Sequence, residues 1–146
     1  MTEIDETAGM SEAGRHEWEL MVAGEVYQDS HPDIERKRAE AKRLFVEYNK
    51  TDYEDVERRR EIMERLFKSI GEDVFIEPNF RCEVGRNITI GSHAYINFDC
   101  VMLDNAPITL GDYVWIAPMV GLFATNHALD FEERKNGACQ AKPIVI

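Results

Sequence analysis

One histidine near the end of the chain stands in a setting where it could act as a base. His127 follows Thr125 and Asn126 in residues 123–142, a polar segment rich in charged side chains. Imidazole, with an unperturbed pKa of about 6.5, is well suited to accept the proton of an attacking hydroxyl at neutral pH. A loop histidine is also often merely solvated. A loop of this length in a compact domain is usually functional or disordered.

Metal chemistry is the competing use of histidine in this part of the chain. A catalytic zinc site of the carbonic-anhydrase kind needs three converging histidines. The repeat region and the polar segment contain only His93 and His127. We therefore expect no metal, and we favour proton transfer.

The segment that positions His127 follows a series of regularly spaced aliphatic residues. In each of two series, successive small apolar residues are six positions apart, then once eight positions apart, and then six again. The first is Val84, Ile90, Ile96, Met102, Leu110, Ile116 and Leu122, and the second is Cys82, Ile88, Ala94, Cys100, Ile108, Val114 and Val120. Neither a helix nor an ordinary strand has this period. Hexapeptide repeats are typical of a parallel β-helix with three short strands per coil.

Glycines and cysteines fit the same architecture. Gly85, Gly91 and Gly111 each follow an aliphatic position, where tight corners favour the positive φ that glycine tolerates. Cys82 and Cys100 are 18 residues apart, so we expect them to stack in neighbouring coils of the core. The chain has three cysteines, an odd number, and no CxxC spacing, which is typical of a protein in the reducing cytoplasm.

The remaining sequence divides into an extension and a helical segment. Residues 1–15 are acidic and rich in small side chains, and we expect a disordered extension. Residues 16–71 look helical, with one amphipathic helix from Pro32 to Asn49 and a second that Thr51 or Asp52 caps and Gly71 ends. We therefore predict a mainly β fold, with an incomplete β-helix at 72–146 and a catalytic loop at 123–142.

Charge and hydropathy exclude two kinds of partner. The formal net charge is −11, whereas a nucleic-acid-binding surface is usually basic. The sequence contains no apolar run of the roughly 18 residues that a membrane span requires. The aliphatic rhythm returns at Ile144 and Ile146, where the sequence ends, which predicts a fragment of a longer β-helix.

Taken together, these motifs resemble the maltose/galactoside O-acetyltransferase family of hexapeptide acyltransferases. The resemblance covers nearly the whole chain after about His16. It is carried by Ala23–Tyr27, Gly71–Val74 with Pro78 and Phe80–Cys82, Gly91 with Tyr95–Phe98, Leu103-Asp104, Pro107–Asp112 and Thr125–His127.

The resemblance implies a left-handed β-helix and an activity. Members of the family transfer acetyl from acetyl-CoA, a co-substrate rather than a tightly bound cofactor, to a hydroxyl of a sugar or similar acceptor. They form homotrimers with the active site between adjacent subunits. His127 matches their general base, and Asn97 matches a residue near the reacting centre that holds the acceptor or polarises the oxyanion.

Acceptor contacts are implied at further positions. Asp29 matches an acceptor-binding aspartate, and Tyr95 is expected in the same pocket. Glu83 and Asn105 align with polar acceptor contacts, and Asp104 could replace Asn105. Outside this set, Arg38 could pair with a carboxylate or with the acceptor, although we favour a solvated helix arginine. Ala138-Cys139-Gln140 occupies the stretch where some members place a glutamate that orients the histidine.

The donor site is the part that this sequence does not supply. Most family contacts to CoA come from later coils, so we assign no CoA-binding residue within 1–146. A serine or xenobiotic acetyltransferase fits the N-terminal helical segment less well. The alternative from a different class is a catalytically incomplete β-helix that serves as an oligomerisation or interaction module.

Overall fold

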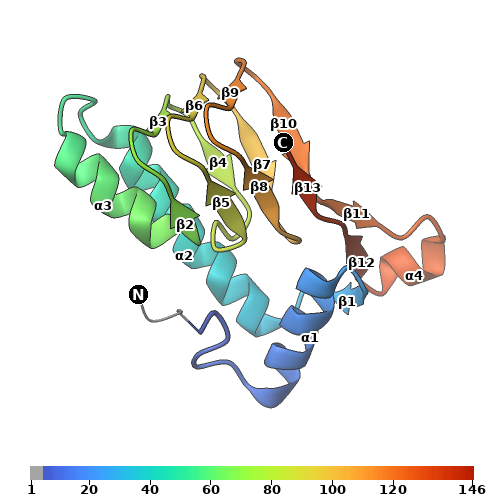
Figure 1. Cartoon of the computed structure of the whole chain (residues 1–146). Helices are drawn as coiled ribbons and strands as arrows, with labels where there is room; N and C mark the ends of the chain where they lie inside the picture. Colours follow the sequence, from blue (N-terminus) through green and yellow to red (C-terminus); the bar gives the residue numbers. More distant parts are fainter. Residues whose placement is uncertain (1–4) are drawn as a thin grey trace.

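The computed structural model describes residues 5–146. Its helices are α1 (Glu12–Ala23), α2 (Pro32–Lys50), α3 (Val56–Leu66) and the short α4 (Phe131–Lys135). Apart from Thr125–His127 and Ala138–Ala141, the strands after α3 are short and stack in parallel, so they form a β-helix that follows a helical N-terminal part (Figure 1). This is the predicted fold.

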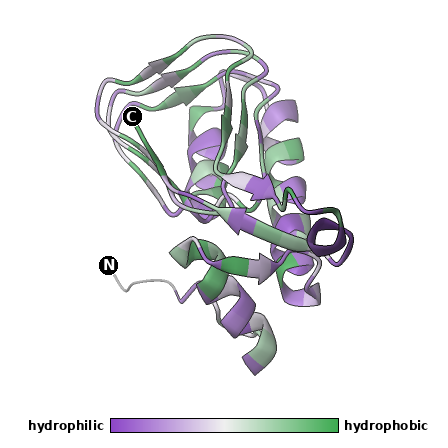
Figure 2. Ribbon diagram, turned by 90° about the vertical axis from the view of Figure 1, so that its right-hand side faces the viewer, coloured by the Kyte–Doolittle hydropathy of each residue, from purple (hydrophilic) through white to green (hydrophobic). Residues whose placement is uncertain are grey.

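Three parallel sheets form the sides of the β-helix, seen along the coils in Figure 2. The first contains β2 (Ser69–Ile70), β5 (Ile88–Ile90), β8 (Ile108–Leu110) and β13 (Ile144–Val145). The second contains β3 (Phe75–Ile76), β6 (Tyr95–Ile96) and β9 (Trp115–Ile116), and the third β4 (Arg81–Cys82), β7 (Val101–Leu103) and β10 (Gly121–Phe123). Their inward aliphatic side chains form the core.

The register shows that each coil between β2 and β10 advances by 20 residues, because one side is lengthened by two. Ile76 lies beside Ile96 and Ile116, and Ile70 beside Ile90. Cys82 pairs with Met102, so the expected stacking of Cys82 on Cys100 is wrong. The eight-residue step recurs at the same corner in successive coils. The sequence reading found it only once, because Cys82 and Val84 were placed two residues out of register.

The lengthened corner is held by a buried carboxylate. The Asp104 Oδ1 atom accepts hydrogen bonds from the backbone N–H groups of Glu83 and Val84, each at 3.0 Å, and Oδ2 accepts one from Asn87 at 3.2 Å. Gly85 takes a φ of +72° in this corner, and an added Cβ would lie 2.5 Å from the Leu66 carbonyl oxygen. Here the expected glycine conformation is present.

At Gly91, close packing rather than backbone conformation requires glycine. A Cβ on Gly91 would lie 2.4 Å from the carbonyl carbon of Gly111 in the next coil. The positive φ values fall instead on non-glycine residues such as His93 and Tyr113, both at 59°. Glycine therefore lets successive coils approach at this edge.

The helices α2 and α3 cover the first coil. The Tyr48 hydroxyl donates to the Ile76 carbonyl at 2.7 Å, and Arg59 donates to the same carbonyl at 2.6 Å while lying 4.2 Å above the Tyr48 ring. The Asn49 side chain bonds both the N–H and the carbonyl of Phe80. These bonds satisfy backbone groups that the first coil would otherwise leave without a neighbouring strand.

The N-terminal region is more ordered than expected. The predicted disordered extension covered residues 1–15, but Ser11 caps α1 at Glu12, and Met10 is buried. Glu6 forms an ion pair with Arg86 of the lengthened corner, with Nη2 and Oε1 2.6 Å apart. Residues 1–4 of that prediction lie outside the described residues.

A separate antiparallel sheet replaces much of the predicted loop at 123–142. Strand β12 (Ala138–Ala141) lies between β1 (Val26–Gln28) and β11 (Thr125–His127), and α4 connects β11 to β12. The first helix, α1, packs against β1 and β12. Over residues 5–146, no helix is both long enough and apolar enough to cross a bilayer.

Candidate active site

The antiparallel sheet brings three predicted or newly found side chains into one row. Cys139 on β12 lies directly opposite Tyr27 on β1 and directly opposite His127 on β11. Directly opposed residues project from the same face of a sheet. Tyr27 and Cys139 are each only 2% exposed, whereas His127 is exposed. The imidazole therefore lies at the open end of a buried row.

The His127 ring contacts the thiol of its neighbour. The Cys139 Sγ atom lies 3.1 Å from His127 Nδ1, a hydrogen bond whose direction depends on the tautomer. Burial, with the nearby Asp29 carboxylate adding to it, raises the pKa of the Cys139 thiol to about 11. The thiol is therefore neutral at physiological pH.

Next to this row lies a network of charged side chains from three parts of the chain. Arg38 of α2 donates to the Asp29 carbonyl at 2.8 Å and pairs with the Asp29 carboxylate. Its Nε atom lies 2.5 Å from Glu83 Oε1, in a close ion pair rather than an aligned hydrogen bond. Arg38 also pairs with Glu35 at 2.8 Å. The network thus brings the predicted acceptor contacts Asp29 and Glu83 together.

The expectation that Arg38 is solvated is wrong. Its side chain is 6% exposed, and three carboxylates surround it. Burial by itself would lower the pKa of the guanidinium, but the charges of Asp29 and Glu83 more than offset that effect and raise the pKa. Helical spacing could reveal only the pair with Glu35, because Asp29 precedes the helix and Glu83 lies far along the chain.

Asn105 and Tyr27 link the charged network to the row on the sheet. The Asn105 Nδ2 group donates to the Tyr27 hydroxyl at 2.9 Å, and that hydroxyl donates to Asp29 Oδ1 at 3.0 Å. Burial raises the pKa of the Tyr27 phenol, so it stays protonated. In residues 5–146 the buried Asn105 Oδ1 atom has no hydrogen-bond partner. That atom is able to accept a further hydrogen bond.

Asp104 differs from the prediction that it could contact an acceptor. Its residue is fully buried, and its carboxylate accepts from backbone N–H groups of the lengthened corner. Asp104 therefore shapes the backbone beside Glu83 and Asn105. Adjacent polar residues at 104 and 105 gave the sequence no means of telling the corner residue from the site residue.

Tyr95 and Asn97 lie apart from these residues. Tyr95 is on β6, in the second sheet of the β-helix, where its hydroxyl donates to Glu77 at 2.8 Å and its ring stacks on Phe75. The Asn97 Oδ1 atom accepts from the Phe98 N–H at 2.8 Å. No hydrogen bond within the described part of the chain joins either residue to the His127 row. A single copy therefore separates the predicted site residues into two groups.

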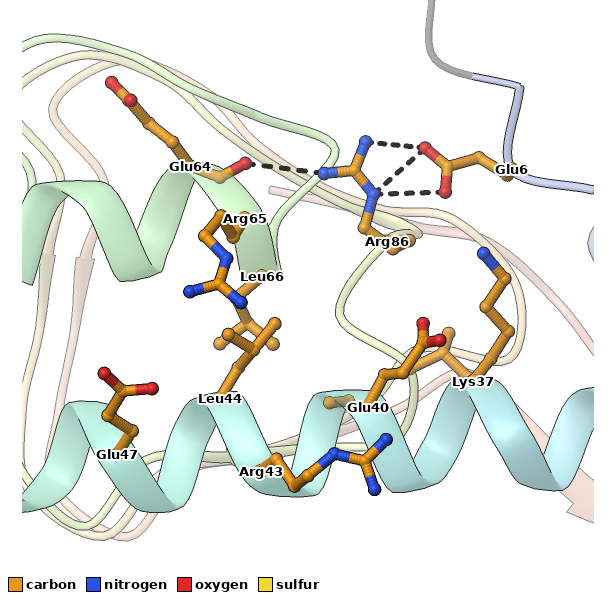
Figure 3. A pocket seen from close by; sticks show the side chains of 12 residues that line it. Glu6, Lys37, Glu40, Arg43, Leu44, Glu47, Glu64, Arg65, Leu66 and Arg86 are labelled. Carbon is orange, nitrogen blue, oxygen red and sulfur yellow. Dashed lines mark hydrogen bonds and ion pairs between the residues drawn. The ribbon is translucent and has the colours of Figure 1, made fainter. Parts of the chain in front are cut away.

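A groove of about 720 Å³ lies elsewhere, between α2, the end of α3 and Arg86 (Figure 3). Its walls carry Glu and Lys or Arg side chains in similar numbers, and none of the predicted site residues lines it. Likewise, no group of three or more His, Cys, Asp or Glu residues suited to a metal ion occurs within 5–146.

Sequence reasoning missed Tyr27 and Cys139 as site residues. Ala138–Ala141 reads Ala-Cys-Gln-Ala, which contains no clear alternation, so the sequence gives only a weak indication of a short strand there. Such a strand next to Thr125–His127 would place one of its residues opposite the histidine. The partner strand at Val26–Gln28 lies more than 100 positions earlier, so spacing alone could not have identified it.

Comparison with known proteins agrees with the fold. The maltose acetyltransferase hexapeptide capping motif matches residues 20–71. Nodulation protein L of Rhizobium meliloti (strain 1021) is 36% identical over 90% of this chain and 72% of its own length. A maltose O-acetyltransferase from Clostridium difficile 630 superposes with a TM-score of 0.84 at 33% identity, over 87% of this chain and 68% of that one.

A galactoside acetyltransferase solved in complex with coenzyme A superposes with a TM-score of 0.81 at 35% identity, over 87% of this chain and 64% of that one. The fold and these matches define a hexapeptide-repeat acyltransferase with a helical cap. The chain belongs to the maltose/galactoside O-acetyltransferase family, whose members use acetyl-CoA as donor. It spans about two thirds to three quarters of the length of the relatives named here.

Proposed function

We propose that this protein transfers an acetyl group from acetyl-CoA to a hydroxyl of a sugar or a related polyol, with His127 as the general base. The observation that carries the proposal is the position of His127, exposed at the end of a row of buried polar side chains and next to a network of carboxylates. Family membership supports the donor, and the site supports the role of the histidine.

In the proposed step, His127 Nε2 accepts the proton of the acceptor hydroxyl as that oxygen attacks the thioester carbonyl carbon. The resulting tetrahedral intermediate collapses, the carbon–sulfur bond breaks, and the imidazolium returns the proton to the departing thiolate. The products are an acetyl ester and free CoA. General-base assistance of this kind contributes roughly 10²- to 10⁴-fold to the rate.

The acceptor is held, in this proposal, by the charged network beside His127. Carboxylates of Asp29 and Glu83 are hydrogen-bond acceptors for sugar hydroxyls, and Arg38 fixes both of them in place. Asn105 is 1% exposed, so in this proposal it supports the acceptor site through the Tyr27 hydroxyl, which in turn bonds Asp29. A pair of carboxylates fixed in place suits a molecule that offers several hydroxyl groups.

We further propose that the second group of predicted residues completes the site from a neighbouring copy in a homotrimer. Asn97 and Tyr95 lie on another side of the β-helix from His127, and a symmetric assembly would place one flank of a copy against a different flank of the next. The Asn97 amide would then face the reacting centre and stabilise the oxyanion.

The free thiols of Cys82, Cys100 and Cys139 fit a cytoplasmic protein.

The test is an acetyl-transfer assay with purified chain, acetyl-CoA and a panel of glycosides and polyols, read out as CoA release. His127→Ala should lower turnover by at least about 10²-fold. Asn126→Ala is the matched control, because Asn126 is adjacent on β11 and projects from the opposite face. Equal turnover of wild type and His127→Ala would contradict the general-base role.

Binding separates this function from the non-catalytic alternative. The proposal expects the chain to bind glycosides, with changes in the NMR signals of His127 and Asp29. If the protein assembles into a stable oligomer but neither binds glycosides nor releases CoA, it is an oligomerisation module.

A further inference from the structure

We propose that Cys139 is a positioning residue for His127, with the cysteine sulfur accepting the Nδ1–H of the imidazole so that Nε2 stays free to take up a proton. This inference rests on the proposed function, because it explains how the general base is prepared. It assigns an orienting role to a thiol, in the stretch Ala138-Cys139-Gln140, which contains no carboxylate.

The contact itself is fixed by the backbone. Cys139 and His127 are directly opposite residues on adjacent antiparallel strands, and the Sγ and Nδ1 atoms are 3.1 Å apart. On its other side, Cys139 lies opposite Tyr27, which is buried and bonded to both Asn105 and Asp29. The thiol therefore has little freedom to move, and it can hold one edge of an otherwise exposed ring.

The chemistry decides the direction of the hydrogen bond. A neutral imidazole carries its hydrogen on one nitrogen and accepts at the other, and a thiol is both a weak donor and a weak acceptor. If the thiol donated to Nδ1, Nε2 would carry the hydrogen and could not act as the base. If Nδ1–H donates to Sγ, the exposed Nε2 is unprotonated and available.

The thiol is suited to this role because it does not ionise. Burial raises its pKa to about 11. A neutral partner orients the ring and selects a tautomer without adding another negative charge beside Asp29 and Glu83. It also argues against the thiol as a nucleophile, since the thiolate is the reactive form and the residue is 2% exposed.

The experiment compares Cys139→Ala and Cys139→Val with Cys139→Ser in the full chain. Serine keeps an atom that accepts the Nδ1–H, valine fills the space without accepting, and alanine removes both. Cys82→Ala is the matched control for loss of a buried thiol elsewhere in the core. Melting curves establish that each variant is folded. If the alanine variant does not fold, the valine variant alone tests the loss of the hydrogen-bond acceptor.

The first readout is the His127 tautomer, from the nitrogen chemical shifts of the imidazole at a pH where it is neutral. Wild type and Cys139→Ser should carry the hydrogen on Nδ1, and Cys139→Ala and Cys139→Val should shift to Nε2–H, the form that histidine prefers in water. Hydrogen on Nε2 in the wild type, or an unchanged tautomer in both the alanine and valine variants, would overturn the inference.

The second readout is turnover. Cys139→Ala and Cys139→Val should lower kcat by roughly 10-fold with little change in acceptor KM, as expected for a residue that orients a catalytic group. Cys139→Ser should keep most of the wild-type kcat. If His127→Ala abolishes turnover but the His127 tautomer is the same in the wild type and in the Cys139 variants, only this inference fails. If the tautomer responds to residue 139 but His127→Ala retains full activity, the proposed function fails instead.

Discussion

At the scale of single residues, buried polar groups determine much of this site. Asp104 is the clearest case, because its carboxylate is fully buried and no basic side chain is among its hydrogen-bond partners. Burial raises its pKa from 3.8 to about 6, although hydrogen bonds from backbone N–H groups of the corner oppose the shift. A carboxyl group whose pKa is raised by folding makes stability depend on pH in a predictable direction.

The sign follows from which state holds the proton. Between about pH 4 and pH 6 the folded protein binds a proton at Asp104 that the unfolded chain releases. The resulting stabilisation is fully present below about pH 4 and is lost as the pH rises through about 6. We expect the free energy of unfolding of the wild type to fall by ~1 kcal/mol more than that of Asp104→Asn between pH 5 and pH 7.

Urea unfolding of the two proteins at several pH values measures this difference. Other titrating groups are common to both proteins, so they cancel in the comparison. Parallel pH profiles would show that Asp104 keeps its ordinary pKa in the folded protein, and that the backbone hydrogen bonds fully compensate for burial.

The resemblance singled out His127 and Asp29, and the structure brings these two residues close together around Cys139 and Tyr27. Their roles in a site stay predictions. Arg38 and Cys139 were misjudged or missed, because what defines them is a partner distant in sequence or an opposed strand. Composition and spacing do not encode such partners.

At the scale of elements, the six-residue rhythm predicted the β-helix, but it did not predict how long a coil is. The rhythm is interrupted by two residues at the same corner of each coil, and a break that recurs every 20 residues is hard to distinguish from a single insertion. The antiparallel sheet of β1, β12 and β11 was also not predicted. Its strands are three or four residues long, too short for alternation to give a clear signal.

The segment before α1 gives a prediction at this scale. Arg86 is 12% exposed at its side chain, pairs with Glu6, and also donates to the Phe67 carbonyl just after α3. Arg86→Ala should lower the free energy of unfolding by ~1–3 kcal/mol, because it leaves a partly buried carboxylate and a carbonyl without their partner. Glu6→Gln should cost less, ~1 kcal/mol or below, as expected of a partly exposed ion pair.

Urea unfolding gives both free energies, and hydrogen exchange gives the local effect. The amides of Ala8 and Met10 bond within the segment, to Asp5 and Thr7. They should lose protection in both variants if the ion pair holds the segment in place. Unchanged protection at Ala8 and Met10 would show that burial of Met10 alone is sufficient.

At the scale of the whole molecule, the separation of the site residues into two groups is the main result. His127, Asp29, Glu83 and Asn105 gather around the antiparallel sheet and the lengthened corner, whereas Asn97 and Tyr95 lie on the sheet of β3, β6 and β9. If the proposed homotrimer forms the site, His127 of one copy works with Asn97 of the next. Two inactive variants can then restore activity in each other.

Mixing His127→Ala with Asn97→Ala tests this directly. In randomly mixed trimers, a complete site needs His127 from an Asn97→Ala copy and Asn97 from a His127→Ala copy. With equal amounts, each condition holds for half of the positions, so about a quarter of the sites are complete. Neither variant alone should have activity, whereas the mixture, refolded or co-expressed, should regain about a quarter of the wild-type turnover in the acetyl-transfer assay.

The matched control mixes His127→Ala with Asp29→Ala. Both residues belong to the same flank of one copy, joined through Cys139 and Tyr27, so no combination of these two variants assembles a complete site. This mixture should stay inactive. Recovery in the control would show that His127 and Asp29 of different copies share one site. No recovery in the His127 and Asn97 mixture, despite mixed trimers confirmed by mass spectrometry, would show that each copy acts alone. Asn97 would then have to reach His127 by a rearrangement within one chain, which the rigid stacking of β6 between β3 and β9 opposes.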